Sequence, residues 1–373
     1  MDDVLHLLAA VKYPLVVSAV LLAHWLSPDC ARLVGVEEPS NKHLTAAERE
    51  ALIRRAQVWK ATDVAAMDIK AGPRLEGAFA PGETVTCDYV QERFSGKTPK
   101  FACAITQGDK VKVRYGRENG EVYAGVAATR LLWTLGFGAD ALYPVHVVCR
   151  GCPAGLAAEG RIEPGQLVFD VAAIERKLPG PDLETPGVGQ GWAWTELDLV
   201  NERAGGPPLE QRDALKLIAV FLQHTDNKPE QQRLICLDPT LEHGAAGCLE
   251  PVMLIHDLGL TFGRANLLNR QSVGSVNLEN WAKTPIWQDR ERCMANLSQS
   301  QTGTLSDPVI SEGGRKFLAN LLSQLSDRQL QDLFEVARFP ERTLSEGIGG
   351  WPVPAWVEAF KKKRDDITGT ICH

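Results

Sequence analysis

The chain has 373 residues, of which 44% are apolar and 23% are charged, a mixture typical of a soluble globular protein with a sizeable core. Its formal net charge of −7 argues against a dedicated nucleic-acid binder, which would carry a basic face. Nine cysteines are the unusual feature of the composition.

An apolar run at residues 15–26 lies near the start of the chain. It is shorter than the roughly 20 residues that a membrane-spanning helix needs and closer to the core of a secretory signal. The positive start of such a signal is missing, because Asp2 and Asp3 stand there, and no A-x-A cleavage site follows. We expect residues 1–30 to be an export or anchoring segment that associates with a membrane. The alternative is an amphipathic or buried helix.

The next part of the chain is predicted to be a helical extension over residues 31–83. Residues 43–60 have the pattern of a helix, with Thr45 as the N-cap and Glu48 three residues later. A loop rich in glycine and proline follows to about residue 83.

Five strands and one helix are predicted next. The strands are expected at residues 84–90, 100–106, 110–115, 143–149 and 166–170, and the helix at 121–135, where Gly136 ends it. The third strand alternates strictly, so that Lys110, Lys112 and Arg114 share one face.

The second half of the chain is mainly helical. A linker rich in proline and glycine spans 179–191, and we expect helices at 209–224, 312–324 and 326–337 with short strands at 233–237 and 251–255. This order predicts an α+β fold of two unequal lobes, a mainly β lobe over 84–178 and a mainly α lobe over 179–373.

The cysteines favour disulfides. Cys87 and Cys103 lie in two strand-like runs, Cys236 and Cys248 bracket a loop, and Cys149 and Cys152 form a single C-x-x-C. A zinc site would need a second such pair or spaced histidines, which the sequence lacks. With Cys30 set aside, the remaining even number indicates an oxidising, extracytoplasmic compartment. Buried reduced thiols in a cytosolic protein are the alternative.

Two motifs carry the functional prediction. His224-Thr-Asp226-Asn227-Lys228-Pro-Glu-Gln231 follows an apolar helix, and His-Asp257-Leu-Gly follows an apolar strand 31 residues after Asp226. The strand that bears three cations and the helix that begins near Glu121 lie upstream.

This order resembles the protein-kinase-like superfamily over roughly residues 84–340. The first motif is similar to the catalytic loop H-R-D-L-K-P-E-N, and Asp257-Leu-Gly is similar to D-F-G. The chain looks most like the divergent branches: the bacterial HipA-like group, the CotH spore-coat group and the secretory-pathway casein-kinase group. The resemblance implies a two-lobed fold and Mg²⁺-dependent transfer of phosphate from ATP to a hydroxyl acceptor, which would be a protein or a small molecule.

Each predicted site residue has a physical role in such a transfer, which depends on positioning and charge neutralisation. Asp226 would orient the acceptor hydroxyl and take its proton, Lys228 would reach the transferred phosphate, and His224 completes the catalytic motif. Asp257 would hold Mg²⁺. Lys112 would pair with the nucleotide phosphates, steadied by Glu121, although Lys110 and Arg114 share its face.

The chain also departs from the kinase pattern. Gln231 stands where the second metal ligand is normally asparagine, and Asn227 is a nearby substitute. The phosphate-binding loop has a single glycine, so Ser95, Gly96 and Lys97 are its expected contacts.

These departures leave three hypotheses: an exported atypical kinase, a non-catalytic kinase-like binding domain braced by disulfides, and a cytosolic HipA-like kinase with free thiols.

Overall fold

The computed structural model describes residues 44–158, 160–185, 190–237, 247–264, 275–297, 303–342 and 349–372. Residues 41–373 form one unit, and residues 1–40 form another. The predicted export segment therefore lies outside the described residues. No helix among those described is long and apolar enough to cross a membrane.

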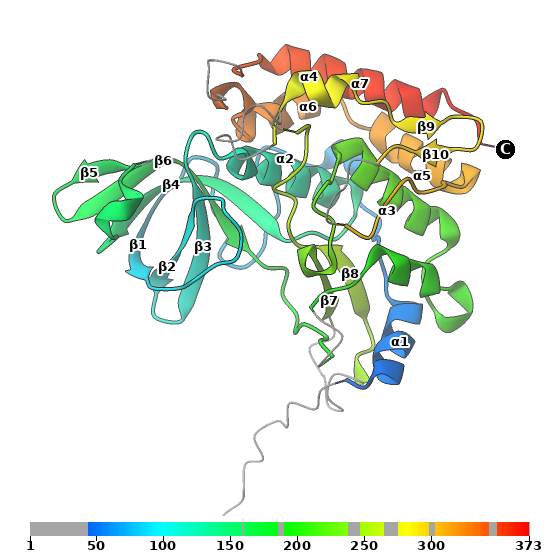
Figure 1. Ribbon diagram of the computed structural model, residues 1–373, viewed down its shortest axis with the longest axis horizontal. Helices are drawn as coiled ribbons and strands as arrows, with labels where there is room; N and C mark the ends of the chain where they lie inside the picture. Colours follow the sequence, from blue (N-terminus) through cyan, green and yellow to red (C-terminus); the bar gives the residue numbers. More distant parts are fainter. Residues whose placement is uncertain are drawn as a thin grey trace, which may run out of the picture. The chain divides into compact units, whose positions relative to one another are not determined.

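A mainly antiparallel sheet of six strands forms the first half of the described unit (Figure 1). Its strands are β1 (Thr84–Val90), β2 (Lys100–Thr106), β3 (Asp109–Tyr115), β4 (Ala141–Arg150), β5 (Arg161–Glu163) and β6 (Gln166–Arg176). The five longer strands were predicted, whereas short β5 was not. The order is β3-β2-β1-β4-β6-β5, and a further pairing of β3 with β6 closes five strands into a ring. The ring was not expected, because a pairing between distant strands leaves no local sequence signal.

The alternation of β3 decides what the ring encloses. Val111 and Val113 are buried in a core shared with Phe101, Tyr143 and Phe169 from other strands. Lys110 and Lys112 lie on the opposite face, as the period of two requires. The barrel thus has an apolar interior and presents the cations of β3 outward.

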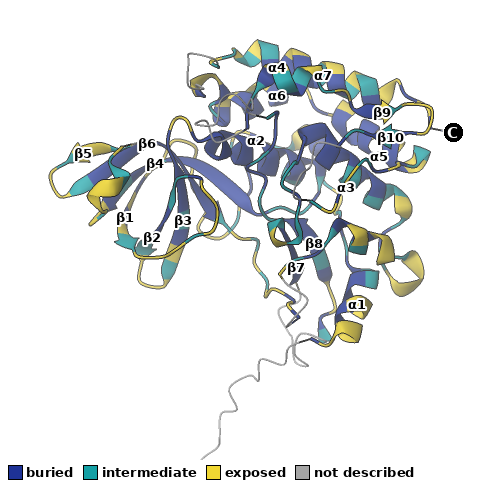
Figure 2. Ribbon diagram, in the orientation of Figure 1, coloured by how far each residue is buried: buried dark blue, intermediate teal, exposed yellow. Residues whose placement is uncertain are grey.

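One helix, α2 (Gly120–Leu135), lies between the barrel and the remaining helices (Figure 1). The Asn119 side chain accepts a hydrogen bond from the Glu121 N–H, and Gly136 ends the helix at a φ of 87°. Trp133 is its only residue that is not buried, so α2 is enclosed on almost every side (Figure 2). A helix so enclosed places the residues of its first turn rigidly.

The rest of the unit is mainly helical, which confirms the predicted α+β class. Helix α3 (Leu209–Leu222) precedes a two-stranded sheet of β7 (Gln232–Cys236) and β8 (Pro251–Ile255). The elements that follow are α4 (Leu278–Lys283), β9 (Trp287–Asp289), β10 (Met294–Ala295), α5 (Glu312–Ser323), α6 (Asp327–Val336) and α7 (Val353–Thr368). Helices α4 and α7 and strands β9 and β10 were not predicted.

The extension before the barrel packs against this helical part. Helix α1 (Ala46–Arg55) has the predicted capping box of Thr45 and Glu48. Its Leu52 and Ile53 are buried in the same apolar core as α3 and β8. Residues 44–83 thus belong to the same folded unit as the rest of the described chain.

Four disulfides brace the structure: Cys87–Cys103, Cys149–Cys152, Cys236–Cys248 and Cys293–Cys372. They confirm the disulfide interpretation of the composition. Disulfides persist in oxidising compartments, so they indicate an oxidising, extracytoplasmic environment.

The longest disulfide loop should contribute most to stability. Cys293 and Cys372 are 79 residues apart and Cys236 and Cys248 are 12 apart. In the chain-entropy description, removing the first bridge by a double change to alanine costs about 4.5 kcal/mol, against about 3 kcal/mol for the second. Urea unfolding of the two double variants without reductant measures both values. A larger loss for the shorter loop would contradict the expectation.

Candidate active site

Three carboxylates from different elements surround one buried arginine on the outer face of β3. Arg114, which is 1% exposed, forms ion pairs with Glu121 of α2 and with Asp257, which follows β8; the second distance, from Nη2 to Oδ2, is 2.8 Å. The same Nη2 lies 3.2 Å from Glu175 of β6. The guanidinium therefore joins the barrel, α2 and the segment after β8 at one point.

The charges of this cluster depend on one another. Burial opposes ionisation of Asp257, but Arg114, His256 and Lys112 outweigh it and hold the pKa of that carboxyl well below its usual range. Burial and the nearby Asp257 raise the pKa of Glu121, although Arg114 acts in the opposite direction. Asp257 is thus the firmly ionised carboxylate beside α2.

The cations of β3 have different partners. Lys112 Nζ lies 2.6 Å from Glu175, and Lys110 Nζ lies 2.6 Å from Glu92 on the loop after β1. The cation paired with Glu121 is therefore Arg114. The sequence had favoured Lys112, two residues earlier on the same strand. The strand pattern places all three cations on one face and could not distinguish them.

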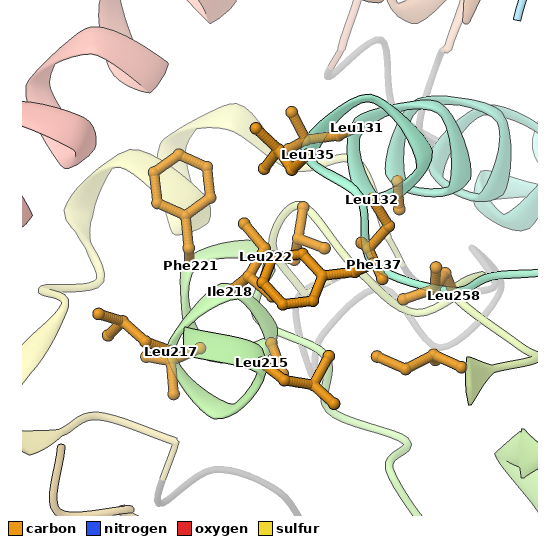
Figure 3. Close-up of a cluster of buried hydrophobic side chains, with 14 of the residues drawn as sticks. Leu131, Leu132, Leu135, Phe137, Leu215, Leu217, Ile218, Phe221, Leu222 and Leu258 are labelled. Atoms are coloured by element: carbon orange, nitrogen blue, oxygen red, sulfur yellow. The ribbon is translucent and has the colours of Figure 1, made fainter. Parts of the chain in front are cut away.

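The segment Asp257-Leu258-Gly259 is fixed by its own packing. Leu258 is buried in the apolar core that also holds Leu132 of α2 and Phe137, which follows α2 (Figure 3). The Gly259 N–H donates to Asp257 Oδ1 over 2.9 Å. A Cβ at Gly259 would come within 2.7 Å of the Glu121 side chain, so glycine is required where the segment passes α2.

The first motif lies beside the second. The Gln231 carbonyl accepts hydrogen bonds from the His256 and Asp257 N–H groups, at 2.8 and 3.0 Å. The side-chain amide of Gln231 donates to Asp226 Oδ2 over 2.7 Å, and Lys228 Nζ lies 3.4 Å from Asp226 Oδ1. Gln231 therefore connects the two loops, and both predicted carboxylates belong to one neighbourhood.

Two other residues of the first motif are buried. The Asn227 amide donates to the His224 carbonyl and accepts from the Leu305 N–H, each over 3.0 Å, so it fixes the chain near residue 305. Neither ring nitrogen of His224 has a hydrogen-bond partner within the described part of the chain. Burial lowers the pKa of His224 to about 4, although Asp257 and Asp226 favour its charge.

The predicted phosphate loop lies between β1 and β2. Ser95, Gly96 and Lys97 are exposed, and Gly96 has a φ of +83°. The Thr98 hydroxyl donates to Glu121 Oε2 over 3.0 Å and so ties the end of the loop to α2. No ion pair of Lys97 is present among the described residues.

A cavity of about 950 Å³ adjoins the cluster, and its lining includes Ala102 of β2, Lys112, Glu175, Lys177 and His256. Sequence reasoning missed the partner of His256, which is one of these lining residues. His256 Nδ1 lies 2.6 Å from Asp140, a buried carboxylate just before β4. Asp140 also accepts from the Leu178 N–H over 2.6 Å and from Arg233 over 2.7 Å. A lone aspartate before a strand carries no motif that would have marked it.

Comparisons with known proteins give little beyond this geometry. No protein-family model matches the chain, and no curated protein matches it. Among solved structures, it is similar to a Helicobacter pylori proinflammatory kinase, CtkA, at 10% identity, over 78% of this chain and 95% of that one, with a TM-score of 0.39. A likeness of that degree supports no functional conclusion, so the site must be interpreted from its own residues.

Replacing Arg114 by lysine tests the cluster. Lysine keeps the charge, but its donors lie on a single nitrogen and cannot span the carboxylates that Arg114 reaches through Nη1 and Nη2. Arg114→Lys should therefore lower the free energy of unfolding by about 2 kcal/mol or more. Arg150→Lys is the matched control, because Arg150 pairs with Asp88 on an exposed part of the barrel. Its effect should stay within about 0.5 kcal/mol in the same urea titration. Equal effects of the two variants would contradict the role assigned to Arg114.

The buried His224 should make the free energy of unfolding depend on pH. Its folded pKa of about 4 lies below the ordinary 6.5, so protons bind preferentially to the unfolded chain. The free energy of unfolding should be unaffected by this group above pH 6.5 and fall by about 3 kcal/mol as pH drops to 4. His224→Phe should remove that part of the loss when chemical unfolding is measured across the range. A pH profile identical to that of the wild type would exclude the assignment.

Proposed function

We propose that this chain is a nucleotide- and Mg²⁺-dependent phosphotransferase with a two-lobed, kinase-like arrangement, in which the barrel and α2 form the smaller lobe. The observation that carries the proposal is the joining of Glu121 and Asp257 by Arg114, with Asp226 held nearby through Gln231. A barrel cation, a helix glutamate and a carboxylate after a strand are the parts that phosphoryl transfer needs to position phosphates and metal.

The oxygen atoms near Asp257 suit a magnesium ion that arrives with its nucleotide. Mg²⁺ takes one or two carboxylates and completes its shell with phosphate oxygens and water. Asp257 is ionised, and Gln231, which donates through its nitrogen to Asp226, keeps an amide oxygen as an acceptor. The described residues contain no group of three or more His, Cys, Asp and Glu side chains placed to hold a metal by themselves. We therefore assign the metal to Asp257 and Gln231 in preference to buried Asn227.

Asp226 is proposed as the group that orients the acceptor hydroxyl and takes its proton. Its carboxylate is held by Gln231, and Lys228 lies close enough to neutralise charge on the transferred phosphate. Bound Mg²⁺ would supply further charge neutralisation at the phosphates. The acceptor is a hydroxyl of a protein or a small molecule, met in an oxidising compartment.

A second candidate function is a non-catalytic, kinase-like binding domain braced by disulfides. The specific observation in its favour is that groups near the cavity are already paired. The Leu178 N–H donates to Asp140, and Lys112 is paired with Glu175. In such a domain these pairs would persist and the cavity would exclude nucleotide.

Two substitutions test the proposed roles separately. Asp226→Ala should abolish phosphate transfer, a loss of at least about 100-fold, while nucleotide affinity changes little, because the acceptor-side carboxylate does not hold the metal. Asp257→Ala should weaken Mg²⁺-nucleotide binding itself. Transfer from radiolabelled ATP and calorimetric binding provide the two measurements, and exposed Asp88→Ala is the control.

Normal turnover by Asp226→Ala would make the catalytic assignment wrong. Absence of any nucleotide binding by the wild-type chain would favour the second candidate function.

A further inference from the structure

The register of β2 against β3 places a fourth cation on the face that carries the site. Lys100 lies directly opposite Arg114, Ala102 opposite Lys112 and Ala104 opposite Lys110. Directly paired residues project to the same face of a sheet. The small alanines leave the space in front of the β3 cations open, and Ala102 lines the cavity.

Charge pairing distinguishes Lys100 from the other three cations. Arg114 is surrounded by Glu121, Glu175 and Asp257, and each β3 lysine has a carboxylate partner at 2.6 Å. Among the described residues, no carboxylate lies within ion-pair distance of the Lys100 ammonium. Its hydrogen-bond partner is the neutral Thr98 hydroxyl, at 3.3 Å.

The surroundings of Lys100 are those of an anion site. A Cβ at Gly96 would lie 3.1 Å from Lys100 Nζ, so the loop backbone passes directly beside the ammonium without a side chain in between. Partial burial lowers the pKa of Lys100, although the negative charges of Glu121 and Asp257 act to raise it. A half-buried ammonium that lacks a counter-charge gains most from an incoming anion.

We propose that Lys100 of β2, and no cation of β3, binds the phosphates of the nucleotide, an inference that depends on the phosphotransferase function proposed above. The β1–β2 loop then supplies both the cation, at its end, and the close backbone approach, at Gly96. Arg114 acts as a positioning residue, which holds Glu121 and Asp257 in place. Lys112 remains paired with Glu175 at the edge of the cavity.

Calorimetric titration with MgATP and with adenosine tests this assignment. Lys100→Met keeps the aliphatic stem and removes the charge, so the Kd for MgATP should rise about 10- to 100-fold, as expected for a lost charge-assisted contact. The Kd for adenosine, which has no phosphate, should stay within about twofold. Lys361→Met is the control, because Lys361 of α7 pairs with Asp327 of α6 and neither residue lines the cavity. Lys100→Arg should recover part of the affinity.

A measurement on the wild-type chain does not depend on how a variant folds. Brief acylation with an amine-reactive ester, followed by peptide mass spectrometry, reports how accessible each ammonium is. MgATP should protect Lys100 from the reagent and leave Lys361 of α7 unprotected.

The outcomes separate this inference from the function on which it depends. If the wild type binds MgATP but Lys100→Met binds it equally well, or Lys100 is not protected, the assignment of Lys100 is wrong and the phosphotransferase proposal stands. If the wild type binds no MgATP, both the phosphotransferase proposal and the assignment of Lys100 are wrong.

Discussion

The arrangement of the site depends on one buried guanidinium. Arg114 leaves the apolar barrel at the end of β3 and meets carboxylates from α2, β6 and the segment after β8. Removing charges from water is unfavourable unless each is paired, so none of these groups can move without leaving another uncompensated. Such a cluster fixes the geometry between the barrel and the loop of Asp257. It also commits the arginine to contacts within the protein, so in the proposed function the phosphates would be bound by another cation.

The local sequence pattern predicted the helices and strands far better than it predicted which strands and side chains pair with one another. Strict alternation in β3 and the caps at Thr45 and Gly136 fixed strands and helices within a few residues. The contact between β3 and β6 that closes the barrel links residues about 60 positions apart, such as Lys112 and Glu175, and leaves no local signal. The two motifs did predict that the loops of Asp226 and Asp257 are neighbours, and Gln231 connects them. The choice between Lys112 and Arg114 could not be made from the strand pattern, because it depends on which side chain reaches Glu121.

The disulfides reinforce the elements that carry the site. Cys87–Cys103 ties β1 to β2 on either side of the loop that holds Gly96. Cys236–Cys248 closes the connection between β7 and β8, and Asp257 follows β8. Cross-links of this kind restrict the unfolded chain and keep flanking strands in register. The metal and phosphate contacts proposed above lie on loops, which would gain rigidity from such bracing.

The proposed function gives the cluster around Asp257 the role of holding a metal-bound nucleotide. It is tested most directly by calorimetric titration of the disulfide-bonded chain with ATP, with Mg²⁺ present and with Mg²⁺ chelated. We expect saturable binding that requires Mg²⁺ and is lost when Asp257 is replaced by alanine. No binding under either condition, or binding of equal strength without Mg²⁺, would contradict it.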